Sequence, residues 1–129
     1  MAHLGVNEFA ALMATGNGYA NGLSAPTSQV SEIAHGEKGT RQTLEKMREL
    51  VLGKEGAHNP EVRFLAQQIV SHVGNKQYED EARAIFEFMR EHVRYTLDPR
   101  GLELVQSPWF TLLVQGQGDC DDHATAAAA

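Results

Sequence analysis

The chain has 129 residues and a mass of 14.1 kDa, with 42% hydrophobic and 22% charged residues, which is the composition of one soluble globular domain. No stretch approaches the roughly 18 consecutive apolar residues of a membrane span, and no lysine or arginine precedes Lys38, so we expect neither a membrane protein nor a signal peptide. The formal charge of −6, without a lysine and arginine cluster, excludes nucleic acid as the expected partner.

Residues 1–37 have the composition of a glycine-rich arm or linker. They hold five of the twelve glycines and only three charged residues, and positions 17–31 are rich in serine, threonine and asparagine. A short apolar patch at 9–13 is typical of a segment that docks onto a neighbouring subunit. We therefore divide the chain into an irregular arm, 1–37, and a folded part, 38–129.

The first predicted helix covers Arg41–Leu52. Thr40 is expected to cap its start, and Gly53 to end it in a left-handed conformation. Its apolar residues recur every three or four positions and are Leu44, Met47, Leu50 and Val51.

Two further amphipathic helices are predicted to share a core with the first. The second begins with Asn59 as N-cap and Pro60 at the first helical position, and Gly74 stops it. Its apolar stripe is Val62, Leu65, Ile69 and Val73. The third, near 79–94, has acidic residues at its start and basic residues at its end, which complements the helix dipole. Its expected buried face is Ala82, Ile85, Phe86, Met89 and Val93.

The sequence after Tyr95 is less regular. It predicts a tight turn at 98–101, an extended segment at 102–106 and a short helix opened by Ser107 and Pro108, with Trp109, Leu112 and Leu113 on the core. Glycines at 116 and 118 end that helix. Asp119 is then a good N-cap, and Asp122 three residues later suggests a capping box, so a final helix starts at Cys120.

Cys120 is the only cysteine, so it cannot form an internal disulfide. At the first position of a helix, the unpaired N–H groups and the positive dipole end favour a thiolate, whereas the aspartates at 119, 121 and 122 oppose one. From these residues alone, Cys120 is either a buried core residue or a nucleophile. A metal site with Asp119 and His123 is a third interpretation, but one helical turn does not easily complete a tetrahedral shell, so no metal or other cofactor is expected.

Several separated motifs resemble the bacterial and prophage branch of the transglutaminase-like superfamily. They are VRYTLDPRG at 93–101, VQSP at 105–108, Leu112, and GDCDDHA at 118–124. The resemblance extends from about Thr40 to the last residue, while residues 1–37 show none. In this family the glycine-aspartate-cysteine turn that opens a helix carries the nucleophile.

The resemblance implies a papain-like α+β fold, in which a helical lobe that carries the nucleophile packs on an antiparallel sheet that carries a histidine and an aspartate. Family members act on amide bonds through a thioester, as cysteine peptidases, amidases or transamidases. It assigns Cys120 as the nucleophile and its N–H as an oxyanion donor. Gln115, Gln117 and Gly118 are further oxyanion and turn candidates, and Asp119 and Asp122 are the helix cap.

The sequence departs from the family pattern after the cysteine. Family members place the histidine and aspartate tens of residues later, whereas nine residues follow Cys120 here. We therefore expect a mainly α-helical chain that corresponds to the N-terminal helical lobe without the sheet. His123 is expected to be a surface residue rather than a replacement base, and the other histidines to lie on the surface. A protein that ends at Ala129 is expected to hydrolyse or transamidate no amide.

Two functions follow as hypotheses. The first is a thiol acyl-transfer domain that acts on protein or peptide amides, located in the bacterial cytoplasm. The second is a phage or prophage structural protein of the virion, in which the arm and helices hold neighbouring subunits in an oligomer and the cysteine is inactive.

Overall fold

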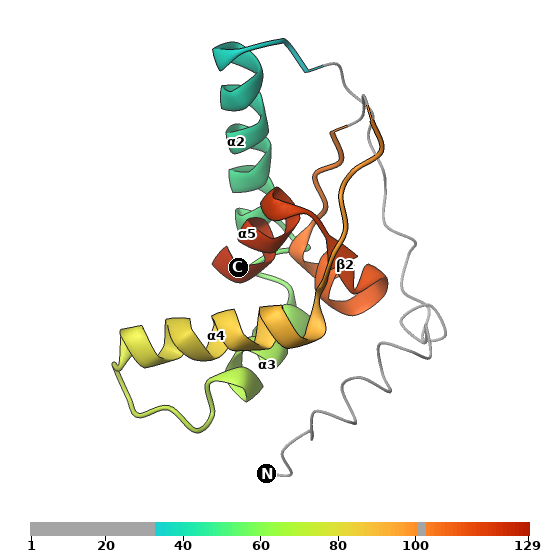
Figure 1. The fold of residues 1–129 in the computed structure, drawn as a ribbon. Coiled ribbons are helices and arrows are strands. Elements are labelled where there is room, and N and C mark those ends of the chain that lie inside the picture. Colours follow the sequence, from blue (N-terminus) through green and yellow to red (C-terminus); the bar gives the residue numbers. More distant parts are fainter. Residues whose placement is uncertain (1–32, 101–102) are drawn as a thin grey trace.

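The computed structural model describes residues 33–100 and 103–129, so most of the predicted arm falls outside the described residues. The described part is mainly helical, which confirms the predicted fold class (Figure 1). Its helices are α2 (Glu37–Leu52), α3 (Pro60–Ile69), α4 (Tyr78–His92), the π-helical turn η2 (Phe110–Gln115) and α5 (Cys120–Ala128). Two short strands, β1 (Arg94–Tyr95) and β2 (Gln117–Gly118), pair in parallel. None of these helices combines the length and the apolar character needed to cross a bilayer.

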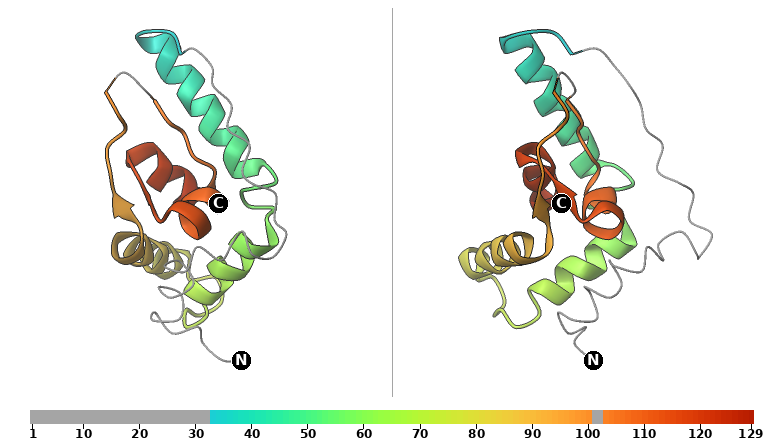
Figure 2. Two further views of the ribbon diagram at one scale, coloured as in Figure 1. Left: turned by 90° about the vertical axis from the view of Figure 1, so that its right-hand side faces the viewer. Right: turned by 45° about the vertical axis from the view of Figure 1, so that its right-hand side comes forward.

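The last helix, α5, lies in the middle of this arrangement. It contacts α2, α4, η2 and β2, and Figures 1 and 2 show these elements around it. The helix that begins with Cys120 is therefore held from several sides.

One hydrophobic core joins the helices. Its buried side chains lie on or beside α3, α4, η2 and α5, and they are Val62, Leu65, Met89, Val93, Trp109, Leu112 and Ala126. Trp109 also ties the core to the polar surface, because its indole Nε1 donates a hydrogen bond to Glu61 Oε2 at 3.0 Å. The predicted core positions on the second helix, the third helix and the Trp109 segment are therefore confirmed in part.

The prediction for the start and end of α2 was wrong in detail. The helix begins at Glu37 rather than Arg41, because the carbonyl of Gly36 already accepts from the N–H of Thr40 at 3.1 Å. Thr40 lies inside the first turn instead of capping it. Gly53 follows the helix with extended backbone (φ −82°, ψ −175°) and not the expected left-handed conformation.

The apolar faces predicted for α2 and α4 are only partly covered by the described residues. Leu44 on α2 is 59% exposed and Phe86 on α4 is 63% exposed, and Ala82 is exposed as well. The main packing partner of α2 is α5, so only part of the apolar face of α2 is covered. Periodicity identifies an apolar face but not how much of it a neighbour covers.

The predicted caps of the next two segments are confirmed. Asn59 caps α3, and Ser107 Oγ accepts from the N–H of Phe110 at 3.2 Å where the short helix starts. However, α3 ends at Ile69, so Val73 and Gly74 lie beyond it. The segment 103–106 has no regular secondary structure. The short helix widens into the π-helical turn, in which the N–H of Gly116 donates to Thr111 O at 2.9 Å.

The Asn59 cap gives a first testable prediction. Its Oδ1 accepts from the N–H groups of Glu61 (2.9 Å) and Val62 (3.2 Å), which have no partner within the helix. Replacing Asn59 by alanine is expected to lower the free energy of unfolding by about 1 kcal/mol. Urea denaturation followed by Trp109 fluorescence measures this, with exposed Asn75→Ala as control. A loss equal to that of the control would contradict the capping role.

Candidate thiol site

The site is built at the first turn of α5. Asp119 is the N-cap, Cys120 is the first helical residue, and the predicted capping box with Asp122 is present. In that box the N–H of Asp119 donates to Asp122 Oδ2 at 3.2 Å. The first turn of α5 is thus fixed by side chains from its own sequence, as local pattern predicts.

The approach to this turn is fixed by β1 and β2. The N–H groups of Arg94 and Thr96 donate to the carbonyls of Gly116 and Gly118, each at 2.9 Å. Gly116 has a positive φ of 65°, which a glycine adopts without strain, and it turns the chain from η2 into β2. This pairing places Tyr95 opposite Gly118, directly before the capped turn.

Gly118 is required by the close packing of the Asp122 side chain. A Cβ at this position would lie 2.5 Å from Asp122 Cβ and 2.6 Å from its Oδ2. Any larger residue at 118 would therefore displace the Asp122 side chain or the backbone.

Asp122 is the buried anchor of the site, with 0% of its surface exposed. Its Oδ1 accepts from the N–H of Gln106 at 2.7 Å, and its Oδ2 accepts from Gln106 Nε2 at 3.0 Å. The pKa of the Asp122 carboxyl is raised to about 6, because burial outweighs the backbone hydrogen bonds from Gln106 and Asp119, which lower it. Sequence reasoning missed Gln106, because no local pattern connects it to a residue 16 positions away.

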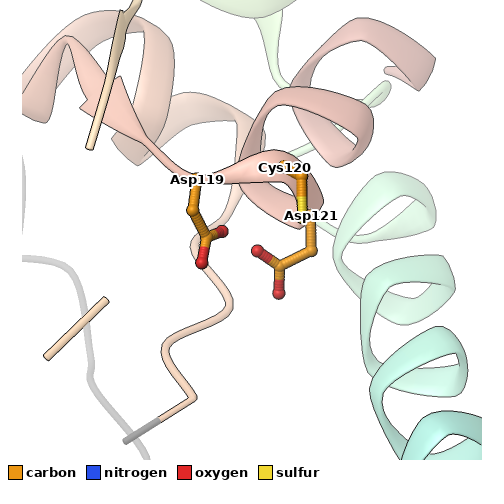
Figure 3. A group of neighbouring side chains, drawn as sticks. All are labelled: Asp119, Cys120 and Asp121. Atoms are coloured by element: carbon orange, nitrogen blue, oxygen red, sulfur yellow. The ribbon is translucent and has the colours of Figure 1, made fainter. Parts of the chain in front are cut away.

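Cys120 itself is exposed, so the interpretation of a buried core cysteine is wrong. The two neighbouring aspartates, by contrast, are buried: Asp119 is 9% exposed and Asp121 is 8% exposed. Figure 3 shows the carboxyl groups of these two aspartates facing one another beside the thiol. The thiol therefore meets solvent at the edge of a buried acidic pair.

The carboxyl groups of Asp119 and Asp121 form few hydrogen bonds with the rest of the described chain. Asp119 Oδ1 and Asp121 Oδ2 are buried, and among the described residues neither has a hydrogen-bond partner outside this carboxyl pair. The pKa of Asp121 is raised to about 8. Burial is the largest cause, followed by the hydrogen bond with Asp119 and the charges of Asp122 and Asp119, while the hydrogen bond from the Asp122 N–H acts in the opposite direction. The Tyr95 pKa is also raised, by desolvation and then by the negative charges at Cys120, Asp119 and Asp121.

The two candidate oxyanion glutamines lie in different surroundings. Gln115 is exposed at the end of η2, whereas Gln117 is half-buried in β2 and its Oε1 accepts from Thr96 Oγ1 at 3.5 Å. Gln117 is thus held by the strand pair that leads to the turn. Both assignments stay predictions.

His123 is half-buried rather than a free surface residue. Its ring packs against that of Tyr95 with centroids 5.8 Å apart, and its buried Nε2 has no hydrogen-bond partner among the described residues. Of the other described histidines, His35, His58 and His72 are exposed as expected. His92 ends α4, where its ring lies 4.7 Å from that of Phe88.

Comparison with known proteins places this turn in a family. A search of curated proteins and a search of solved structures each returned no match. The family model of the transglutaminase-like superfamily, however, matches residues 63–129. That match spans more than half of the chain and includes most of α3, the whole of α4 and η2, and the first turn of α5. The chain therefore belongs to the transglutaminase-like superfamily.

Proposed function

We propose that the chain is a thiol acyl-transfer domain of the cysteine peptidase, amidase or transamidase class, with Cys120 as its nucleophile. The observation that carries this proposal is the exposed thiol at the first position of α5, in the segment that the superfamily model matches. A thiol needs access to its substrate, and the capped helix start provides it without loss of rigidity.

The reaction has two steps. The Cys120 thiolate attacks the carbonyl carbon of a protein or peptide amide, and the oxyanion that forms is stabilised by the Cys120 N–H and the start of α5. The C–N bond then breaks, the thiol proton passes through a base to the leaving amine, and a thioester remains on Sγ. Water or a second amine releases the acyl group. The resemblance assigns the base to a histidine on the sheet of the family fold.

A second candidate function is subunit assembly, as in a phage or prophage virion protein. Several large apolar side chains are exposed, including Phe64 (51%), Phe86 (63%) and Leu97 (74%). An apolar groove of about 650 Å³ also runs between α4 and α5, with Phe86, Tyr95 and His123 among its lining residues. A buried homo-oligomeric interface would account for both features.

Acylation by an activated ester tests the proposed nucleophile. p-Nitrophenyl acetate carries a leaving group that needs no proton, so its reaction tests the thiol and the oxyanion donors separately from the base. We expect the folded chain to release one equivalent of p-nitrophenolate per Cys120, at least about tenfold faster than the chain in urea.

Two variants complete this experiment. Cys120→Ala is expected to abolish the burst, and exposed Asp80→Ala is expected to keep it. Equal rates for folded and urea-unfolded chain would contradict the proposal. Sedimentation of the same samples tests the assembly function, for which a stable oligomer at micromolar concentration without a burst is the distinguishing result.

A further inference from the structure

Three possible metal ligands converge at the start of α5. Ligand atoms of Asp119, Cys120 and Asp121 all lie within 4.8 Å of one another. Tetrahedral ligands of one zinc ion lie roughly 3.3–3.8 Å apart, given metal–ligand distances of about 2.0–2.3 Å. The three ligand atoms therefore lie close to the spacing that one ion requires.

The second observation is that two of these ligands are buried and have only each other as partners. Asp119 and Asp121 are each more than nine-tenths buried. Among the described residues, Asp119 Oδ1 and Asp121 Oδ2 have no hydrogen-bond partner outside this carboxyl pair. Their carboxyl groups face one another (Figure 3). Two facing carboxyl groups hydrogen-bond to each other only while they share a proton, and a cation between the two carboxylates takes the place of that proton.

A neighbouring acidic cluster is a weaker candidate. Oxygen atoms of Asp98, Asp119 and Asp122 also lie within 4.8 Å of one another. However, both oxygens of Asp122 already accept hydrogen bonds, and Asp98 Oδ2 accepts from the N–H of Leu104. The free acceptor atoms therefore belong to Asp119 and Asp121.

The charge around the site is negative. None of the ion pairs found among the described residues involves these aspartates, since the pairs lie along α2 and α4. The start of α5 contributes a positive partial charge of about +0.5, which opposes a cation. Two carboxylates and a thiolate outweigh this contribution.

We propose that Asp119, Cys120 and Asp121 form a binding site for one divalent transition-metal ion of the zinc type. The two carboxylates and the thiolate supply three ligands, and the exposed face of Cys120 leaves the fourth position to water. On binding, the Cys120 thiol releases its proton as the S–Zn bond forms, and the carboxyl pair releases the proton that it shares, both to solvent. Metal binding and nucleophilic attack then exclude one another at the same sulfur, so Zn²⁺ inhibits the thiol.

Titration of the metal-free chain with Co²⁺ and Zn²⁺ tests the site directly. We expect one equivalent of Co²⁺ to produce a thiolate-to-cobalt absorption band that Zn²⁺ removes. Cys120→Ala is expected to abolish the band. Asp121→Asn and Asp119→Asn are each expected to weaken Zn²⁺ binding at least tenfold, since even outer partners of metal ligands change affinity about 10–100-fold.

The asparagine variants keep the local structure. Asparagine at 121 still offers an Oδ1 to the Asp122 N–H, and asparagine at 119 is a good N-cap. Asp98→Asn is the matched control and is expected to bind Zn²⁺ like the parent chain. Weaker binding by Asp98→Asn, with Asp121→Asn unchanged, would assign the ion to the other acidic cluster and overturn the proposal.

A measurement on the unaltered chain completes the test. Zn²⁺ is expected to protect Cys120 from iodoacetamide in a saturable manner, and EDTA is expected to restore the reaction. Unchanged alkylation at saturating Zn²⁺, without a cobalt band, would overturn the proposal. The test of the metal site is independent of the test of acyl transfer. Acylation is measured in EDTA, so its result does not depend on whether the chain binds Zn²⁺.

Discussion

Replacing Asp122 by alanine is expected to lower the free energy of unfolding by about 3 kcal/mol at pH 7. The carboxyl group is fully buried and accepts hydrogen bonds from the Gln106 N–H, the Gln106 side-chain amide and the Asp119 N–H. Alanine leaves these donors without an acceptor and removes the capping box. Because burial raises the Asp122 pKa to about 6, the loss of a buried charge offsets part of this effect.

Urea denaturation measures the change, since the only tryptophan, Trp109, is 5% exposed and reports on the core. Asp80→Ala, an exposed aspartate in the first turn of α4, is the matched control and is expected to cost far less. A loss for Asp122→Ala no greater than that of Asp80→Ala would show that the buried network does not stabilise the site.

Replacing Gly118 by alanine is expected to cost about 2–3 kcal/mol, because the added methyl group overpacks a buried position. Its Cβ would meet Asp122 Cβ at 2.5 Å and Asp122 Cγ at 2.9 Å. The side chain cannot rotate away without breaking its hydrogen bonds to Gln106. We expect the start of α5 to move as a result, so the acylation rate of Cys120 falls together with stability.

Gly74→Ala separates packing from the general effect of losing a glycine. A Cβ at Gly74 meets the Gln77 side chain, whose amide end lies at 2.7 Å and is free to move at the exposed surface. The same urea titration is expected to show a much smaller loss for this variant. If both glycine variants lose the same stability, the contact with Asp122 is not the cause.

Local signals in the sequence predicted the ends of several elements. Asn59 before Pro60, Ser107 before Pro108, and the Asp119–Asp122 pair each satisfy free N–H groups of a first turn within three residues. Such interactions need only neighbours along the chain, so the pattern is sufficient. The start of α2 was missed because its first carbonyl comes from Gly36, which lacks a recognisable cap side chain.

Contacts between segments that lie far apart in the chain could not be predicted from the sequence. Gln106 reaches Asp122 only because η2 turns the chain back, and Tyr95 meets Gly118 only through the β1–β2 pairing. Periodicity likewise placed Phe86 on the apolar face of its helix, but it did not show that this side chain is exposed. These features depend on how elements pack, which no local pattern encodes.

The candidate site was predicted in part. Cys120 was identified because it is the only thiol and follows a glycine-aspartate pair at a helix start. Its exposure excluded a buried core residue, and that exposure depends on how α5 packs, which the sequence does not show. The facing carboxyl groups of Asp119 and Asp121 also depend on the twist of the first turn, which residue spacing does not give.

Mapping of an acyl adduct tests the central claim, that the start of α5 presents Cys120 as a nucleophile. The folded chain in EDTA is treated with a short peptide thioester, and the product is measured by intact mass and by peptide mapping. We predict one acyl group per chain, carried by the peptide that contains Cys120, and none on Cys120→Ala. Acyl groups spread over lysines, or a chain of unchanged mass, would contradict the claim.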